Sequence, residues 1–143
     1  MTPQERAERC ASIMWEADAA SQWLGMRLEA VGPGTATLSM QVADHHLNGH
    51  GMCHGGLVFS LADSAFAFAS NSFNARTVAQ ENSITFLLPA MDGETLTAVA
   101  QRTASQGRSG VYDVTVSGED GRMLAVFRGL SRTVKGHLFE EET

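Results

Sequence analysis

Asp63 is the side chain of this sequence whose surroundings best suit a chemical role. It is a lone carboxylate in a stretch of small and weakly polar residues, and no lysine or arginine occurs from residue 28 to residue 75. Because burial without a nearby cation disfavours the charged form, such a carboxylate has a raised pKa and can serve as a general base or a nucleophile. The alternative is a structural aspartate that bonds the hydroxyl of Ser60 or Ser64.

A second feature is the run His54-Gly55-Gly56, which directly precedes the helix predicted to carry Asp63. A helix N-terminus presents unpaired backbone N–H groups and a partial positive charge, and glycine lets a ligand approach the backbone closely. These are the requirements of an oxyanion hole for an acyl carbonyl. The run alone also fits a plain tight turn, but with Asp63 two turns further along it indicates acyl-transfer chemistry.

The histidines around this run do not predict a metal site. Three of them recur every fourth residue, as on a helix face, but four glycines in the same stretch disfavour a helix by about 1 kcal/mol each. Cys53 beside His54 suggests a nucleophilic dyad, yet neighbouring side chains of an extended segment point in opposite directions. We therefore expect neither a bound metal nor a thiol nucleophile. The clustered histidines are His45, His46, His50 and His54.

A central helix over about 56–72 must position Asp63. At about 100° per residue, its large apolar residues fall on one broad side, which should pack on a sheet. A face open to water would normally carry long charged side chains, and the opposite face carries none. We therefore expect a second subunit to cover that face, with a solvated face as the alternative. The face comprises Gly56, Ser60, Asp63, Ser64, Ala67, Ser70 and Asn71.

The rest of the chain predicts an N-terminal helix over about 3–24 and an antiparallel sheet, which together define the α+β class. Thr2, Pro3 and Glu5 form a helix-start signature. The pairs Asp92-Gly93 and Asp120-Gly121 are hairpin-type turns. Strands are expected over 26–31, 35–42, 77–88, 94–104, 110–117 and 123–134.

Length and composition predict a single domain over residues 1–143, with a flexible tail over 136–143. A formal net charge of -6 argues against a nucleic-acid binder. Two cysteines are too few for a disulfide framework or a four-thiolate zinc site. The N-terminus is polar and no apolar run approaches the ~20 residues that span a bilayer. We therefore expect a cytoplasmic protein that does not bind membranes.

The stretch LNGHGMCHGGLVFSLADSAFAFASNS, over 47–72, closely resembles the signature of the hotdog-fold thioesterases of the phenylacetic acid degradation (PaaI) type. The segments ENSITFLLPAMDGETLTA and GRSGVYDVTV are similar to strands of the same family. The resemblance implies a hotdog fold, in which a curved antiparallel sheet of five to six strands wraps the long central helix, with an N-terminal helix in addition. It also implies a homodimer that completes the active site, usually within a homotetramer.

The resemblance further assigns roles to residues. Asp63 matches the catalytic carboxylate, and Gly55 matches the glycine whose N–H polarises the thioester carbonyl. Asn48 and His54 match residues that position the thioester and water beside it. Gly55 of one subunit should face Asp63 of the other. The residues expected to bind substrate are Gly56, Ser64, Asn82 and Arg128.

The activity implied by the resemblance is hydrolysis of (hydroxy)phenylacetyl-CoA, or of related aryl or medium-chain acyl-CoA thioesters, without a cofactor other than the CoA of the substrate. The alternatives are a non-catalytic acyl-CoA-binding hotdog module and another hotdog acyl-CoA enzyme, such as a hydratase or dehydratase. Six of the ten basic residues lie in the last 42 positions. Some of these are expected to hold the phosphates of CoA, with ordinary solvated side chains as the alternative.

Overall fold

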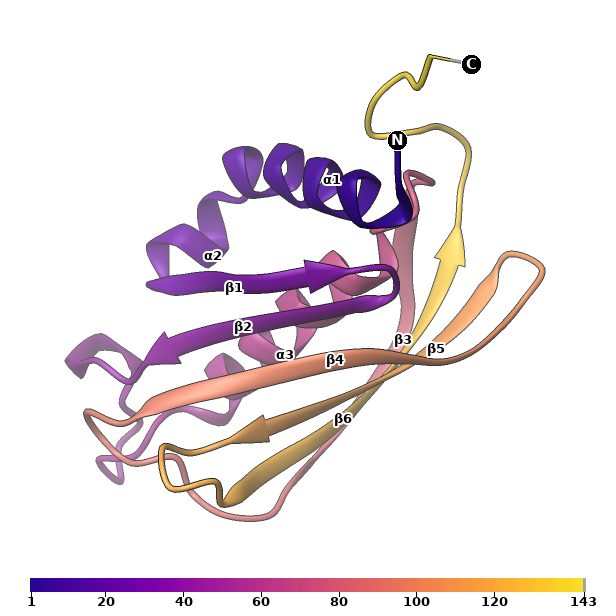
Figure 1. Ribbon diagram of the computed structural model, residues 1–143. Coiled ribbons are helices and arrows are strands. Elements are labelled where there is room, and N and C mark those ends of the chain that lie inside the picture. The colour runs from indigo at the N-terminus through magenta and orange to yellow at the C-terminus, as the bar shows by residue number, and fades with distance from the viewer. Residues whose placement is uncertain (143) are drawn as a thin grey trace.

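The computed structural model describes residues 1–142 and confirms the predicted architecture, in which one curved antiparallel sheet wraps a central helix (Figure 1). The six strands lie in the order β1-β2-β4-β5-β6-β3. No helix within residues 1–142 is both long enough and apolar enough to cross a membrane. The elements are α1 (Pro3–Ala17), α2 (Ala19–Trp23), β1 (Met26–Gly32), β2 (Thr35–Gln41), a 3-10 turn (Asp44–His46), α3 (Gly55–Ser70), β3 (Thr77–Phe86), β4 (Thr95–Gln106), β5 (Ser109–Ser117) and β6 (Met123–Thr133).

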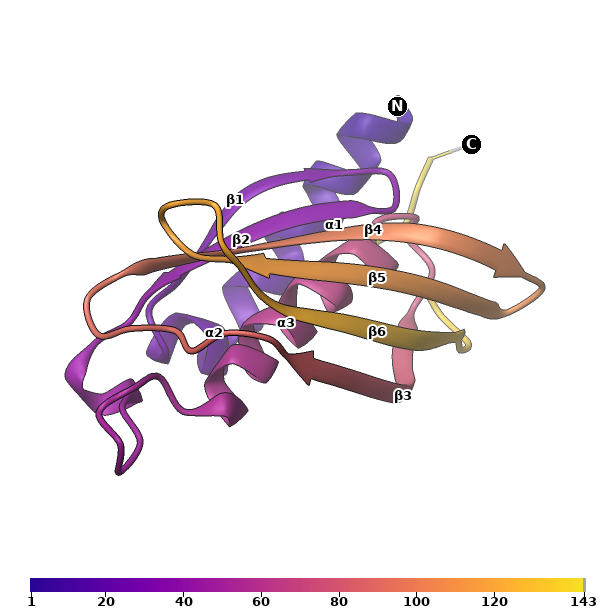
Figure 2. The same ribbon diagram turned by 90° about the horizontal axis from the view of Figure 1, so that it is seen from below.

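Helix α3 supplies the centre of the core. Figure 2 shows it behind the strands, and its apolar side packs into the concave face of the sheet. The ring of Phe66 lies 5.6 Å from that of Tyr112 and 5.9 Å from that of Phe127. Directly opposite, a Cβ on Gly129 would come within 2.7 Å of the Phe66 ring. The sheet therefore has a glycine where the helix approaches it most closely.

The prediction of two hairpins is confirmed at one turn and wrong at the other. Asp120-Gly121 does join the paired strands β5 and β6, but Asp92-Gly93 joins β3 to β4, and β3 pairs with β6 at the edge of the sheet. The chain after β3 runs back to the loop before α3, where the carbonyl of Ala90 accepts from the N–H of Cys53 over 2.9 Å. The N–H of Gly93 then donates to Val42, over 2.9 Å, and directs β4 onto β2.

The predicted limits of both long helices need correction. The N-terminal helix predicted over 3–24 is divided, because the carboxylate of Asp18 accepts from the N–H and the hydroxyl of Ser21 and so caps a new helix, α2. Helix α3 starts one residue earlier and ends two residues earlier than the predicted 56–72. It ends because the carboxamide of Asn71 bonds the backbone N–H and carbonyl of Thr77 and turns the chain into β3.

The predicted flexible tail, 136–143, is instead held against the fold over most of its length. Asn74 accepts from the N–H of Phe139 over 3.1 Å and donates to its carbonyl over 3.0 Å. The guanidinium of Arg9 on α1 lies 4.3 Å from the centre of the Phe139 ring. These contacts join segments far apart in the chain, so a local pattern does not show them. Thr143 lies outside the described residues.

The small-residue face of α3 is only partly as predicted. Asp63, Ser64 and Ala67 are half-exposed, which leaves this side of an otherwise buried helix open. Ser70 and Asn71, predicted on the same face, are instead buried by their own chain. The open part of the face is therefore centred on Asp63.

Candidate active site

The Asp63 carboxylate is held by Asn82 of the edge strand β3. The Asn82 carboxamide donates from Nδ2 to Oδ1 of Asp63 over 2.9 Å. Asp63 forms no ion pair within residues 1–142. Burial raises the pKa of Asp63, and the bond from Asn82 lowers this pKa by a smaller amount. The structure thus contains the carboxylate that the sequence predicted, half-buried and with no cation beside it.

The two serines next to Asp63 do not bond it. Ser60 donates to the carbonyl of Gly56 over 2.8 Å, and the hydroxyl of Ser64 lies 2.9 Å from that of Ser21 on α2. A structural aspartate satisfied by Ser60 or Ser64 is therefore excluded. Ser64, predicted to bind substrate, instead connects α3 to α2 in the isolated chain.

The carboxamide oxygen of Asn82 also bears on the site. This oxygen, Oδ1, is buried and has no hydrogen-bond partner within residues 1–142. Buried polar atoms in complete proteins are nearly always bonded. The Asn82 carboxamide, beside Asp63, therefore lacks one hydrogen-bond partner in the single chain. The sequence placed Asn82 among the substrate-binding residues, but only the pairing of β3 with β6 brings it to α3.

The start of α3 presents one free backbone donor. His54 is the N-cap, and its Nδ1 accepts from the N–H of Gly56 over 2.9 Å. The N–H of Leu57 is also used, by the carbonyl of His54. The N–H of Gly55 has no acceptor within residues 1–142. Of the predicted glycine pair, Gly55 is therefore the residue able to bind an oxyanion, while Gly56 is occupied by the cap.

The loop before α3 is ordered by Asn48. Its Oδ1 accepts from the N–H groups of His50 and Met52, over 2.9 Å and 3.2 Å. The carbonyl of His46 accepts from the N–H of His54 over 2.8 Å. Asn48 is thus a structural centre of the loop as well as a neighbour of Gly55.

An apolar cavity of about 310 Å³ lies beside Gly55. Its outer wall comes from the end of β3 and from the chain that follows it. A Cβ on Gly55 would lie 3.1 Å from the Phe86 ring, so the glycine leaves space for that ring. Phe86, the last residue of β3, and Leu87, directly after it, are exposed apolar side chains. The lining residues are Asn48, Met52, Cys53, Gly55, Val58, Phe86, Leu87, Leu88, Pro89 and Ala90.

Cys53 does not act with His54 as a nucleophilic dyad. Its thiol is buried, which raises its pKa to about 11, and its Sγ lies 3.7 Å from the carbonyl of His54. A thiol with this pKa is protonated at neutral pH and is a poor nucleophile. Within residues 1–142, no three histidine, cysteine or acidic side chains are arranged to hold a metal ion.

The predicted residues form two separate groups in one chain. Asn48, His54 and Gly55 meet at the start of α3, and Asp63 meets Asn82 further along it. Gly55 and Asp63 are eight residues apart on one helix, which is about 12 Å along its axis. Arg128 belongs to neither group, because it lies on the convex face of the sheet in an ion pair of 2.8 Å with Asp113.

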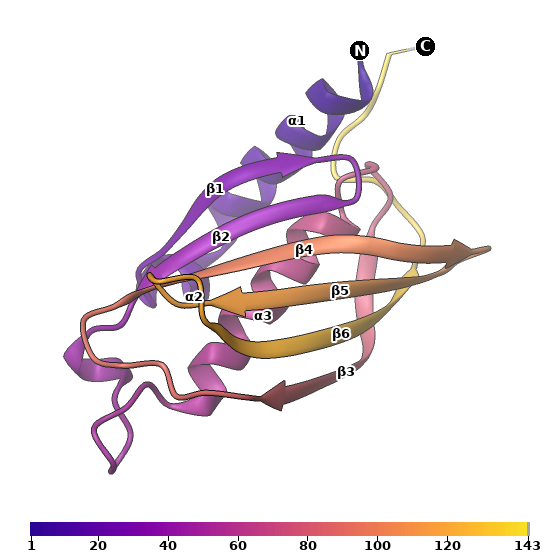
Figure 3. The ribbon, with the colours of Figure 1, turned by 60° about the horizontal axis from the view of Figure 1, so that its bottom comes forward.

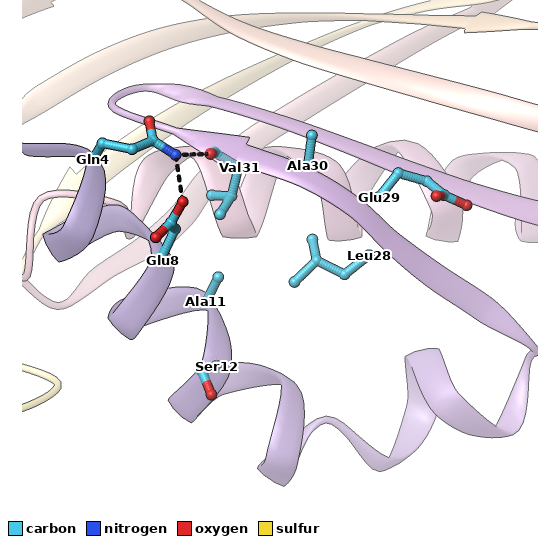
Figure 4. Close-up of a pocket in the computed structure, with 8 residues that line it drawn as sticks. All are labelled: Gln4, Glu8, Ala11, Ser12, Leu28, Glu29, Ala30 and Val31. Carbon is cyan, nitrogen blue, oxygen red and sulfur yellow. Dashed lines mark hydrogen bonds between the residues drawn. The ribbon is translucent and has the colours of Figure 1, made fainter.

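A second hollow, of about 450 Å³, lies between α1 and β1 (Figure 4). Its two carboxylates are exposed and already bonded: Glu8 accepts from Gln4 over 2.9 Å, and Glu29 accepts from Ser39 over 2.6 Å. Gln4 also donates to the carbonyl of Val31 over 2.8 Å. This hollow therefore contains no counterpart of the half-buried Asp63 carboxylate or of the free N–H of Gly55 on α3.

Comparisons with known proteins find relatives that match nearly the whole chain. Residues 50–125 match the sequence profile of the thioesterase superfamily. The acyl-coenzyme A thioesterase PaaI of Escherichia coli is 40% identical over 136 residues, which are 95% of this chain and 97% of that protein. A solved structure of the E. coli PaaI protein superposes with a TM-score of 0.93, covering 95% of this chain and 99% of that chain. A single-residue variant of PaaI from Thermus thermophilus is 33% identical, with a TM-score of 0.77, covering 80% of this chain and 97% of that chain.

The capping bond of His54 leads to a test of its role. His54→Ala removes the acceptor for the N–H of Gly56 and should lower the free energy of unfolding by about 1 kcal/mol, whereas His54→Asn keeps a favoured N-cap and should recover most of this loss. Urea unfolding followed by circular dichroism measures both. Equal stability of the alanine variant and the wild type would contradict the capping role.

Proposed function

The chain belongs to the thioesterase superfamily, and from this premise we propose that it hydrolyses acyl-CoA thioesters to the free acid and CoA. The observation that carries the proposal is the half-buried Asp63 carboxylate, which has one hydrogen bond, from Asn82, and no cation beside it. One carboxylate and one backbone N–H donor can suffice to hydrolyse a thioester, because the thiolate is a good leaving group. We propose no cofactor beyond the CoA carried by the substrate.

In the proposed reaction, Asp63 takes a proton from a water molecule as the water oxygen attacks the thioester carbonyl carbon. The N–H of Gly55 donates to the oxyanion that forms. Collapse of this intermediate breaks the C–S bond, and the CoA thiolate takes up the proton. Direct attack by the carboxylate, through a mixed anhydride, would place the same demand on Asp63, because both routes need it ionised.

The apolar cavity beside Gly55 supports an aryl or medium-chain acyl group as substrate. Its volume of about 310 Å³ and its lining by Phe86, Leu88 and Val58 suit a phenylacetyl or hydroxyphenylacetyl group. The E. coli relative comes from a phenylacetic acid degradation operon. We propose that Asn48, which also lines the cavity, orients the thioester. The two free, buried cysteines fit the proposed cytoplasmic location.

The proposed active site needs two subunits. An oxyanion donor must lie about 3 Å from the carbonyl oxygen, so Gly55 and Asp63 of one helix, about 12 Å apart, cannot serve the same thioester. We propose that Gly55 of one protomer faces the partner subunit's Asp63. The free edge of β3, the open face of α3 and the unbonded Oδ1 of Asn82 support a homodimer, and the family resemblance implies a homotetramer built from it.

Replacement of the proposed base tests the function directly. Asp63→Asn keeps the side-chain volume but removes the base, so release of CoA thiol from phenylacetyl-CoA should fall by a factor of about 10² or more. Asp113→Asn, on the convex face of the sheet, is the matched control and should keep wild-type turnover. Wild-type turnover in Asp63→Asn would disprove the assignment.

The bond from Asn82 predicts a change in pH dependence. This bond lowers the pKa of Asp63, so Asn82→Ala should raise that pKa further. A larger fraction of Asp63 is then protonated at a given acidic pH, and the acid limb of kcat/KM should move to higher pH. A lowered plateau with an unmoved limb would show that Asn82 acts otherwise than on the proton affinity of Asp63.

Complementation between two inactive variants tests the shared site. Gly55→Pro removes the N–H with little change in the backbone, because proline is favoured at the first position of a helix and His54 has a backbone compatible with a following proline. It should lower kcat by about 10²–10³. After subunit exchange with Asp63→Ala, half of the dimers are mixed and have one intact site, so activity should return to about a quarter of wild type.

Gly55→Ala is the control for added bulk, because it places a Cβ against Phe86 and keeps the N–H. It should retain far more activity than Gly55→Pro. If the mixture of Gly55→Pro and Asp63→Ala stayed inactive while sedimentation showed mixed dimers, the two residues would belong to sites within one subunit.

A further inference from the structure

We propose that a third cavity, at the C-terminal end of α3 and separate from the two described above, binds a phosphate group of the CoA moiety through Arg102 and Arg108. This rests on the proposed function, since it names the part of the substrate held away from the thioester. The cavity measures about 190 Å³. It exists because the β4–β5 hairpin extends beyond the end of α3, which leaves the concave face uncovered there (Figure 3).

The lining of this cavity is suited to an anion. Thirteen residues line it, and none is acidic, although the chain as a whole has a formal net charge of -6. Seven of the thirteen have hydroxyl groups, and all of these except Ser70 and Thr77, which donate to backbone carbonyls, can donate to phosphate oxygens. The hydroxyl residues are Ser70, Thr77, Ser105, Ser109, Tyr112, Ser131 and Thr133.

The two arginines are available for a ligand, unlike Arg122 and Arg128. Arg122 is paired with Glu94 and Asp120, and Arg128 is paired with Asp113. Arg102 and Arg108 form no ion pair within residues 1–142. Guanidinium groups bind phosphate through paired N–H donors.

Arg102 is also oriented by its surroundings. Its guanidinium lies 4.5 Å from the centre of the Phe73 ring, and it occupies a register position opposite the buried Tyr112. Stacking on the ring face uses none of the N–H donors, which lie in the plane of the guanidinium. The contact therefore orients Arg102 without using its donors; the guanidinium also interacts with the Tyr112 hydroxyl, and its five N–H groups leave further donors for a ligand.

The cavity lies at a suitable distance from the proposed thioester position. Ser70, at the cavity, is seven residues beyond Asp63 on α3, which is about 10 Å along the helix axis. The pantetheine arm has two amide bonds and a length comparable to four or five residues of extended chain, about 15 Å. An arm that runs along α3 from Asp63 therefore brings the phosphates of CoA to the two arginines.

The test compares substrates with and without phosphates. Arg108→Ala and Arg102→Gln should each raise KM for phenylacetyl-CoA about tenfold or more, since hydrogen bonds to charged groups have this strength, with kcat little changed. Their KM for phenylacetyl-pantetheine, which has no phosphate, should equal that of the wild type. The 3′-dephospho-CoA thioester then distinguishes the 3′-phosphate from the pyrophosphate as the group that is bound.

Arg132→Ala is the matched control. Arg132 lies between two cavity-lining residues of β6, but strand alternation turns its side chain to the convex face. Arg132→Ala removes the same charge from the same region of the protein and should leave the KM for phenylacetyl-CoA unchanged. A wild-type KM for phenylacetyl-CoA in both cavity variants, or an equal rise in Arg132→Ala, would overturn the proposal.

Failure of the proposed function would look different, because wild-type protein would then release no thiol from any of these thioesters. Binding of 3′,5′-ADP, measured by calorimetry, remains a readout in that case. Loss of binding in Arg108→Ala but not in Arg132→Ala would support the cavity as an anion site. Equal binding by wild type and both variants would overturn it.

Discussion

Packing of α3 into the concave face of the sheet is the interaction on which the rest of this structure depends. Phe66 approaches the sheet so closely that only glycine fits at position 129, and this contact sets the rotation of the helix. With the apolar side turned inward, Asp63 must emerge toward the edge strand β3, where Asn82 meets it. The same packing holds the start of α3 against the Phe86 ring, so the free N–H of Gly55 opens next to an apolar cavity.

A single helix thus carries both parts of the proposed catalytic apparatus, but too far apart to act together. The separation of about 12 Å follows from helix geometry and does not depend on details of packing. Two antiparallel copies of α3 would bring each Gly55 to the partner subunit's Asp63. The open face of α3, which is rich in small residues, permits such close approach. In this view the small residues serve assembly and catalysis at once.

For ligand binding, the positions of the charged side chains in this protein matter more than the net charge of the chain. An acidic chain is a poor partner for a polyanion such as CoA, yet Arg102 and Arg108 line a cavity without any acidic residue. Arg122, in the loop before β6, and Arg128, on β6, are instead paired with carboxylates. Asp63 is the converse case, because its carboxylate lies where no cation reaches it and burial raises its pKa.

Local patterns in the sequence were enough to predict α3, its free N-terminal donor and its lone carboxylate, because helix periodicity and capping act within a few residues. They also predicted the strands and the α+β class. Only the tertiary structure decided that Asn82 holds Asp63, that β3 pairs with β6, and that Phe139 anchors the tail on Asn74. The physical reason is the same in each case: these contacts join residues far apart in the chain, and desolvation depends on everything that surrounds a group rather than on its neighbours in sequence.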